Sequence, residues 1–378
     1  MMRGQPSARS VGSAGASLRR RPLDTYWLSV RAGAVLAAFG LLVAIAADAE
    51  TLLTPYARDF AAYYAAAVRL THGAALFIPS VASGPPDSQS VLAWRYAPYL
   101  ALLFVPFTAL PFSLAAAVWA TMHVIVGVWV VRVLPVPRGL KLALLIWTPF
   151  VTDVWVGNIS TFMVGAFLVG WRWLPATGLV GAIKPYAALT LLELAASRAW
   201  RALGISVAIW LGVVALSLPI VGVQSYLDFF RSIVPTASAS YADIGGGGLL
   251  EVAHQIGMPM AAAGVAFVVA GILTLAALRQ AGPLRSALIL LVSAAWSPIV
   301  HIHGWLLAMP AMAMMGNGMF WLLYVAYAAD YRSLWWLVTT VVVAWVEWGR
   351  MRRARDAAVS SQVMLIDAGD AAVETAEP

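Results

Sequence analysis

Three polar residues stand out in an otherwise apolar chain because their types suit chemistry on a hydroxyl and an anion. Asp59 is the second residue of the segment 58–70, Lys184 lies within an apolar run, and His303 follows a Ser-Pro pair. A carboxylate is suited to taking a proton from a hydroxyl, and a cation is suited to stabilising a negative charge that develops during a reaction. We therefore take these three residues as the first candidates for a site.

Asp59 has two interpretations from the sequence alone. Apolar and aromatic residues recur at helical spacing after it, so the segment predicts a helix over 59–71. Acidic residues are common in the first turn of a helix, because the N-terminal end of the helix dipole favours negative charge. Asp59 is thus either a residue that stabilises the helix start or a catalytic carboxylate at a membrane face, and both roles can hold together.

In the predicted topology, a set of polar residues that includes Arg58 and Arg231 falls on the same membrane face as Asp59 and His303, whereas Lys184 lies within a span. Lys184 is costly inside a membrane, by about 2.5–3.5 kcal/mol on insertion scales, so it faces either a cavity, a bound anion or the interface. The remaining candidates for substrate binding are polar or aromatic residues of the loops and breaks between spans: Arg58, Tyr63, Asn158, Arg231 and His301. We expect His72, His123 and His254 to be structural.

No metal or cofactor site is expected. The chain has no cysteine. His301 and His303 are two residues apart, so they diverge on a helix and make a poor zinc pair. The run of four glycines at 245–248 is not followed by Lys-Ser/Thr, so it is not a nucleotide-binding loop and reads as a flexible loop.

Composition identifies an integral membrane protein. The chain is 62% hydrophobic and 11% charged, with 17 tryptophans, whereas soluble domains carry about 25% charged residues. The apolar runs are long and do not alternate, which favours helices over a barrel. The net charge of +7 lies in arginines at both ends and in short turns. That pattern sets membrane orientation and argues against nucleic-acid binding.

The chain predicts one polytopic, all-helical membrane domain at 23–350. It is preceded by a disordered basic segment at 1–22 and followed by a disordered tail at 351–378, and both termini are predicted to be cytoplasmic. We expect about twelve spans, at 26–47, 96–110, 113–134, 140–155, 160–174, 176–196, 203–222, 259–278, 285–299, 304–316, 318–329 and 333–348.

The outer loops are predicted at about 48–95 and 223–255, with the helix at 59–71 lying along the membrane surface. One turn conflicts with this count. The basic turn at 132–141 falls outside, although positive charge favours the cytoplasm.

Several segments, in order along the chain, resemble glycosyltransferase family 87. This family contains polyprenol-phosphate-sugar-dependent transferases of the GT-C type, including mannosyltransferases of phosphatidylinositol mannoside assembly. The matching pieces are Asp59-Phe60 with Tyr63-Tyr64, Gly73 and Leu76-Phe77, Tyr96-Ala97-Pro98 with Pro106 and Pro111, Gly157-Asn158, Ile183-Lys184-Pro185 with Trp200 and Arg201, and Ser297-Pro298 with His303.

The resemblance implies a fold and a reaction. It implies a GT-C membrane enzyme that moves one sugar, with mannose the best single choice, from a polyprenyl-phosphate donor to a lipid or glycan acceptor at the extracytoplasmic face of the plasma membrane. It implies that Asp59 is the base, that His303 serves the active site and that the anomeric centre is inverted. The family usually has Gly-Gln at 157–158 and two prolines at 184–186, and these departures concern the donor and acceptor more than the reaction.

Two other classes fit parts of the sequence. A transporter or lipid flippase accounts for an intramembrane lysine, but such proteins tend to show internal repeats and midplane charges. A non-catalytic membrane scaffold accounts for Asp59 and His303 as structural residues, but leaves the one-sided set of polar residues unexplained.

Overall fold

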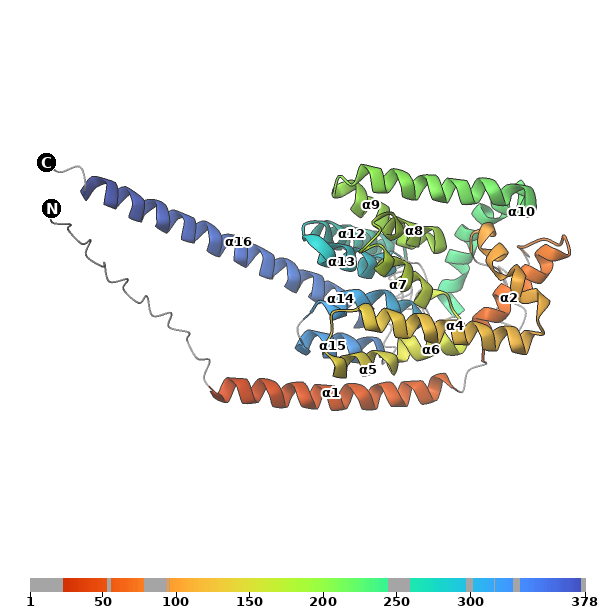
Figure 1. Cartoon of the computed structure of the whole chain (residues 1–378), viewed down its shortest axis with the longest axis horizontal. Helices are drawn as coiled ribbons and strands as arrows, with labels where there is room; N and C mark the ends of the chain where they lie inside the picture. The colour runs from red at the N-terminus through yellow and green to blue at the C-terminus, as the bar shows by residue number, and fades with distance from the viewer. Residues whose placement is uncertain are drawn as a thin grey trace, which may run out of the picture.

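The computed structural model is entirely helical over the residues that it describes. These are residues 23–52, 56–77, 94, 96–243, 259–296, 302–315, 317–328 and 334–374. Short and long helices form one bundle, from which α1 and α16 extend in the same direction (Figure 1). The expectation of an all-helical protein is confirmed for this part of the chain.

The helices in chain order are α1 (Leu23–Thr51), α2 (Arg58–Thr71), η2 (Pro98–Ala109), α4 (Phe112–Val133), α5 (Arg138–Leu145), α6 (Thr148–Val156), α7 (Ser160–Val169), α8 (Pro175–Ile183), η3 (Pro185–Ala188), α9 (Leu189–Ala196), α10 (Trp200–Asp243), α12 (Pro259–Leu278), α13 (Gly282–Ala295), η4 (Ile302–Ala308), α14 (Met309–Ala313), α15 (Asn317–Ala328) and α16 (Leu334–Glu374).

Two helices of the described chain are long and apolar enough to cross a membrane, namely Phe112–Val133 and Trp200–Arg231. The pair α5 and α6 adds a third span if the two helices, bent by 41°, are counted together. Large apolar side chains such as Leu211, Leu216 and Phe230 are exposed along α10, as lipid-facing side chains are. Two of the twelve predicted spans, 96–110 and 176–196, differ in the structure as described below, and the number of crossings stays a prediction.

The segment 96–110 does not cross the bundle, which corrects the predicted topology. Tyr96, before η2, hydrogen-bonds to Tyr63 of α2, and Leu110, after η2, accepts a hydrogen bond from Tyr64 of the same helix. Phe104, within η2, lies with its ring centroid 4.7 Å from that of Tyr63. η2 therefore runs along α2 at one end of the molecule, because its aromatic residues pack on that helix.

The segment 176–196 is a hairpin of two short helices and not one span. The chain breaks at Lys184, whose backbone is extended, and Pro185 starts the next helical turn. Gly181 lets the two arms approach closely, since an added Cβ would lie 2.8 Å from the Cα of Ala188. The helices α6, α7, α8 and α9 have nine, ten, nine and eight residues, about half the roughly 20 needed for a full crossing.

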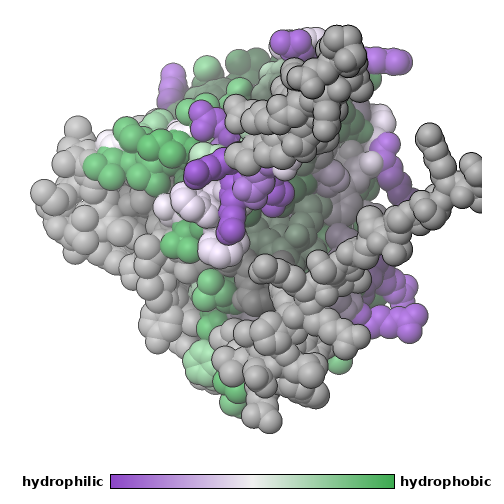
Figure 2. All heavy atoms as spheres, turned by 90° about the vertical axis from the view of Figure 1, so that its left-hand side faces the viewer, coloured by the Kyte–Doolittle hydropathy of each residue, from purple (hydrophilic) through white to green (hydrophobic). Residues whose placement is uncertain are grey.

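With 96–110 beside α2 and 176–196 folded as a hairpin, the turns of the chain lie at two opposite ends of the bundle. The α2 end holds α2, η2, the turn at 157–159 and the break at Lys184. The basic end holds the turns at 134–137, 197–199 and 279–281, which lie on the left of the bundle in Figure 1, and Figure 2 shows hydrophilic side chains projecting from this face. The turn at 132–141 thus lies at the same end of the bundle as the other basic turns (Figure 1).

Hydrogen bonds tie the turns of the basic end together. Arg285 Nη1 donates to Ser197 Oγ at 2.7 Å, which joins α13 to the end of α9. Gln280 Nε2 donates to Glu347 Oε2 at 2.6 Å, and Arg350 donates to both oxygens of the same carboxylate. The ends of α9, α12, α13 and the middle of α16 are therefore held side by side.

Two predicted irregular segments are helical. Residues 223–243, expected as a loop, continue α10 after a kink at Gly222, where φ is 76°. Residues 351–374, expected as a disordered tail, continue α16 to Glu374. Alanine and arginine, which are strong helix formers, are frequent in the first part of that tail.

Candidate active site

The first turn of α2 presents Asp59 at the α2 end of the bundle. Ala57 occupies the N-cap position with a left-handed φ of 55°, and its N–H donates to the carbonyl of Trp155 at 2.8 Å. This bond fixes the start of α2 to α6. The Asp59 side chain is 20% exposed, and its Oδ1 lies 3.5 Å from Nε of Arg58. The carboxylate is therefore fixed by neighbours but remains reachable from outside.

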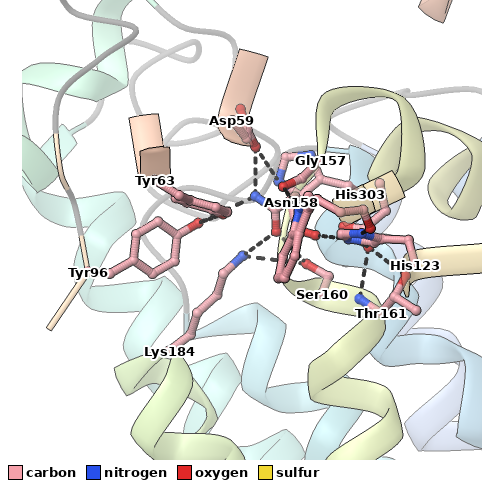
Figure 3. A network of polar contacts seen from close by, with 12 residues as sticks. Asp59, Tyr63, Tyr96, His123, Gly157, Asn158, Ser160, Thr161, Lys184 and His303 are labelled. Atoms are coloured by element: carbon pink, nitrogen blue, oxygen red, sulfur yellow. Dashed lines mark hydrogen bonds and ion pairs between the residues drawn. The ribbon is translucent and has the colours of Figure 1, made fainter. Parts of the chain in front are cut away.

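Asn158 links Asp59 to Lys184. Its Nδ2 donates to Asp59 Oδ2 at 2.7 Å, and its Oδ1 accepts a hydrogen bond from Lys184 Nζ at 3.1 Å (Figure 3). Both Asn158 and Lys184 are buried. A neutral amide thus spaces a carboxylate from an ammonium group, and each charge keeps a hydrogen bond inside a low-dielectric region, as buried charges require.

A hydroxyl and two phenols complete the surroundings of Asn158. Ser160 Oγ donates to Asn158 Oδ1 at 2.9 Å and lies 3.5 Å from Lys184 Nζ. Asn158 Nδ2 also reaches the Tyr96 hydroxyl at 3.4 Å, and that hydroxyl is 2.8 Å from the hydroxyl of Tyr63. Lys184 Nζ stands 5.7 Å from the centre of the Tyr96 ring, a cation–π distance.

The break at Lys184 is stabilised from the opposite side. Pro185 has no N–H, so carbonyl groups at the end of α8 lack helical partners. The Tyr99 hydroxyl donates to the carbonyl of Ala182, and Trp210 Nε1 of α10 donates to that hydroxyl at 3.0 Å. These contacts hold the extended residue Lys184 so that its side chain points to Asn158 (Figure 3).

His303 approaches Asp59 from η4. Its ring is buried, and its Nε2 lies 3.8 Å from Asp59 Oδ2. Residues more than 240 positions apart in the chain therefore meet at one carboxylate. His301 and the pair Ser297-Pro298, also named from the sequence, lie outside the described residues.

The other two candidates differ from expectation in their placement. Arg231 is exposed on α10 and pairs with Asp228 of the same helix, with Nη1 and Oδ1 3.7 Å apart. Tyr63 is 2% exposed and packs inside the protein. The hydroxyl groups of Tyr63 and Tyr64 each make a hydrogen bond within the protein.

Ser160, His123 and Asp153 belong to this network but are not among the candidates from the sequence. The position of Ser160 two residues after Asn158 is a signal for a shared turn. From the sequence we expect His123 to be structural, and Asp153 shortly precedes the polar break at Gly157-Asn158. These two lie behind Asn158, with His123 Nε2 3.5 Å from Asp153 Oδ2. No sequence spacing could connect residues that belong to α4 and α6.

The site thus contains the carboxylate of Asp59, which is reachable from outside and lies beside His303. The side-chain amide of Asn158 connects this carboxylate to the buried Lys184. Among the described residues, no group of three or more histidines, aspartates or glutamates is arranged to hold a metal ion. The expectation that no divalent metal takes part stays a prediction.

Comparisons with known proteins agree on one family. The profile of glycosyltransferase family 87 matches residues 94–310. A polyprenol-phosphate-mannose-dependent alpha-(1-2)-phosphatidylinositol pentamannoside mannosyltransferase of Mycolicibacterium smegmatis (strain ATCC 700084 / mc(2)155) is 29% identical over 316 residues, which cover 75% of this chain and 76% of the relative. The protein of the same name from Mycobacterium tuberculosis (strain CDC 1551 / Oshkosh) is 26% identical over 304 residues, covering 71% and 69%.

No solved structure matches the chain significantly. The family match contains Tyr96, Asn158, Lys184 and His303, whereas Asp59 precedes it. The match extends over more than half of the chain, and the site described above joins four of its residues to α2. The chain therefore belongs to glycosyltransferase family 87 and is a membrane glycosyltransferase.

Proposed function

We propose that this enzyme transfers a mannosyl residue from a polyprenyl-phosphate donor to a hydroxyl of a lipid or glycan acceptor, with Asp59 as the general base. The observation that carries the proposal is the pairing of a reachable carboxylate with a buried lysine through Asn158. The choice of mannose rests on the two relatives, which use polyprenol-phosphate-mannose.

The reaction is one displacement at the anomeric carbon. The acceptor oxygen forms a bond to that carbon, the bond from the carbon to the phosphate oxygen breaks, and polyprenyl phosphate leaves with the bonding electrons. The acceptor proton goes to the Asp59 carboxylate, a role suited to a group within hydrogen-bond reach of the acceptor. Attack opposite the leaving group inverts the anomeric configuration.

The cations would act on the phosphate. Lys184 is the buried cation of the site, and charge that develops on a leaving phosphate is stabilised strongly where water is excluded. Ser160 Oγ, 3.5 Å from Lys184 Nζ, adds a hydroxyl beside it. Arg58 and His303 flank Asp59 on its two sides and are the candidates to orient the acceptor or to neutralise charge as the proton moves.

The α2 end would face the extracytoplasmic side. Arginine and lysine residues gather in the turns of the opposite end, and such residues favour the cytoplasm. A lipid-linked donor needs no nucleotide pocket, and its apolar tail would lie in the bilayer. The plasma membrane is the proposed location.

The test is the Asp59→Asn variant in proteoliposomes that contain polyprenyl-phosphate-mannose and an acceptor lipid extract. A general base contributes about 10²–10⁴-fold, so we expect a loss of transfer in that range with unchanged protein yield. Asp228→Asn is the matched control, because that carboxylate pairs with Arg231 on the exposed face of α10.

A wild-type rate for Asp59→Asn would overturn the assignment of the base. Profiling the lipid-linked glycans of a strain that lacks the protein tests the sugar, since the missing residue identifies both donor and acceptor. Donor flux without transfer would instead support a transporter.

A further inference from the structure

Two buried rings of α4 contact the turn that carries Asn158. Trp119 Nε1 donates to the carbonyl of Gly157 at 2.9 Å, and His123 Nε2 hydrogen-bonds to the carbonyl of Asn158. Residues four apart lie on the same face of a helix. The indole and the imidazole thus contact consecutive carbonyl oxygens of one turn, and α4 fixes the backbone from which the Asn158 side chain extends.

Both ring nitrogens of His123 face backbone carbonyl groups. Its Nδ1 lies 3.0 Å from the carbonyl of Trp119, and its Nε2 faces the carbonyl of Asn158. A carbonyl oxygen only accepts hydrogen bonds. Both oxygens would be satisfied by a ring that carries a proton on each nitrogen.

Asp153 provides the opposite charge. Its Oδ2 is 3.5 Å from His123 Nε2 and accepts two further hydrogen bonds, from the N–H of Thr161 at 2.8 Å and from its hydroxyl at 2.6 Å. Thr161 thus donates twice to this oxygen, and the His123 ring lies beside it. Neither His123 nor Asp153 is exposed at all, and a charge in such a place persists only with a partner of opposite sign.

We propose that the buried imidazolium–carboxylate pair of His123 and Asp153 is a positioning device for transfer. It holds the turn at 157–158 so that the Asn158 amide keeps Asp59 and Lys184 at the spacing that the reaction needs. The proposal rests on the function proposed above, because the two groups that it positions are the base and the phosphate-binding cation. Neither His123 nor Asp153 touches the reacting atoms.

The kinetic test compares single and paired variants. His123→Phe removes the contact with the Asn158 carbonyl, and we expect kcat to fall by about 10²-fold, the order that a misplacement near 1 Å costs, with KM for the donor little changed. His123→Gln and Asp153→Asn each leave one buried charge without a partner. The double variant His123→Gln/Asp153→Asn is neutral and retains an amide donor, so we expect a higher kcat than in either single variant.

The matched control is His72→Gln, since His72 is exposed at the end of α2; we expect wild-type kinetics. Variants are compared only as monodisperse protein in detergent. If His123→Phe does not fold, the double variant is compared with the two single variants. Paired charges that act on kcat predict a higher kcat in the double variant than in either single one. Unrelated sites predict a lower kcat in the double variant, and this result would overturn the proposal.

A spectroscopic test is independent of activity. The chain has five histidines, and ring ¹⁵N signals of histidine-labelled protein in bilayers can be assigned to His123 by their loss in His123→Gln. We expect both ring nitrogens to be protonated. A neutral ring, or wild-type kcat in folded His123→Phe, would overturn the proposal.

The variant Asp59→Asn separates the two proposals. If Asp59→Asn retains activity, the proposed function fails, whatever the state of His123. If Asp59→Asn is inactive while His123→Phe is fully active, only the positioning role fails.

Discussion

Gly157 should be the least replaceable glycine of the site. It ends α6 with a φ of 73°, a left-handed conformation that L residues rarely adopt. A Cβ at this position would lie 2.7 Å from the Cβ of Phe60 and 3.2 Å from the indole of Trp119. Phe60 is fully buried and packs among aromatic rings of η2 and α4, so it has no room to move away.

Gly73 offers a matched comparison at the other end of α2. Its φ is 66°, but nothing lies within 4 Å of an added Cβ. The left-handed conformation costs a non-glycine residue about 1–2 kcal/mol, which is the whole cost expected for Gly73→Ala. Overpacking adds about 1–3 kcal/mol, so Gly157→Ala should lose about 2–5 kcal/mol of stability.

Stability is measured by SDS-induced unfolding in mixed micelles, with tryptophan fluorescence as the signal. The transfer assay gives kcat for the same variants. The clash should push the turn at 157–158 away from α2, and a shift near 1 Å lowers kcat by about 10²-fold. Gly73→Ala should transfer at nearly the wild-type rate. Equal stability and equal kcat in the two variants would refute the reasoning, because the contact with Phe60 would then not confine the turn.

Three further changes test other parts of the structure. Lys184→Met keeps the side-chain volume and removes the cation, so kcat should fall by about 10²–10³-fold and the affinity for free polyprenyl phosphate should weaken; a wild-type kcat would exclude the lysine from phosphate stabilisation. The chain has no cysteine, so single cysteines report topology without background: an impermeant maleimide should label Ala74→Cys from outside the cell and Gly139→Cys only after permeabilisation, and the reverse pattern would contradict the orientation. Arg198 is an exposed residue with a φ of 56°. Arg198→Gly removes a backbone cost of about 1–2 kcal/mol and adds the entropy cost of a glycine, about 0.5–1 kcal/mol, so the stability in the SDS assay should rise by about 0.5–1 kcal/mol; a loss would show that the arginine side chain contributes more than its backbone costs.

Several features of this protein follow from the sequence alone. Composition requires a helical membrane protein, because so few charged residues cannot cover a soluble surface. Local periodicity predicts the helix after Asp59, which the structure gives as Arg58–Thr71. Lys184 stands out because a lysine in an apolar run requires a polar partner, and Asn158 stands out because it breaks two apolar segments. Each of these signals is local or compositional.

The tertiary structure decided which apolar segments fold back and which residues meet. Hydropathy does not distinguish a crossing helix from η2, which stays beside α2 because Tyr63 and Tyr64 hydrogen-bond near both of its ends. With 96–110 counted as a span, Asn158 falls on the side of the membrane opposite Asp59, yet their side chains are 2.7 Å apart. The site depends on contacts between residues about 100 to 240 positions apart, and such contacts arise from the packing of whole helices and not from any local pattern of residues.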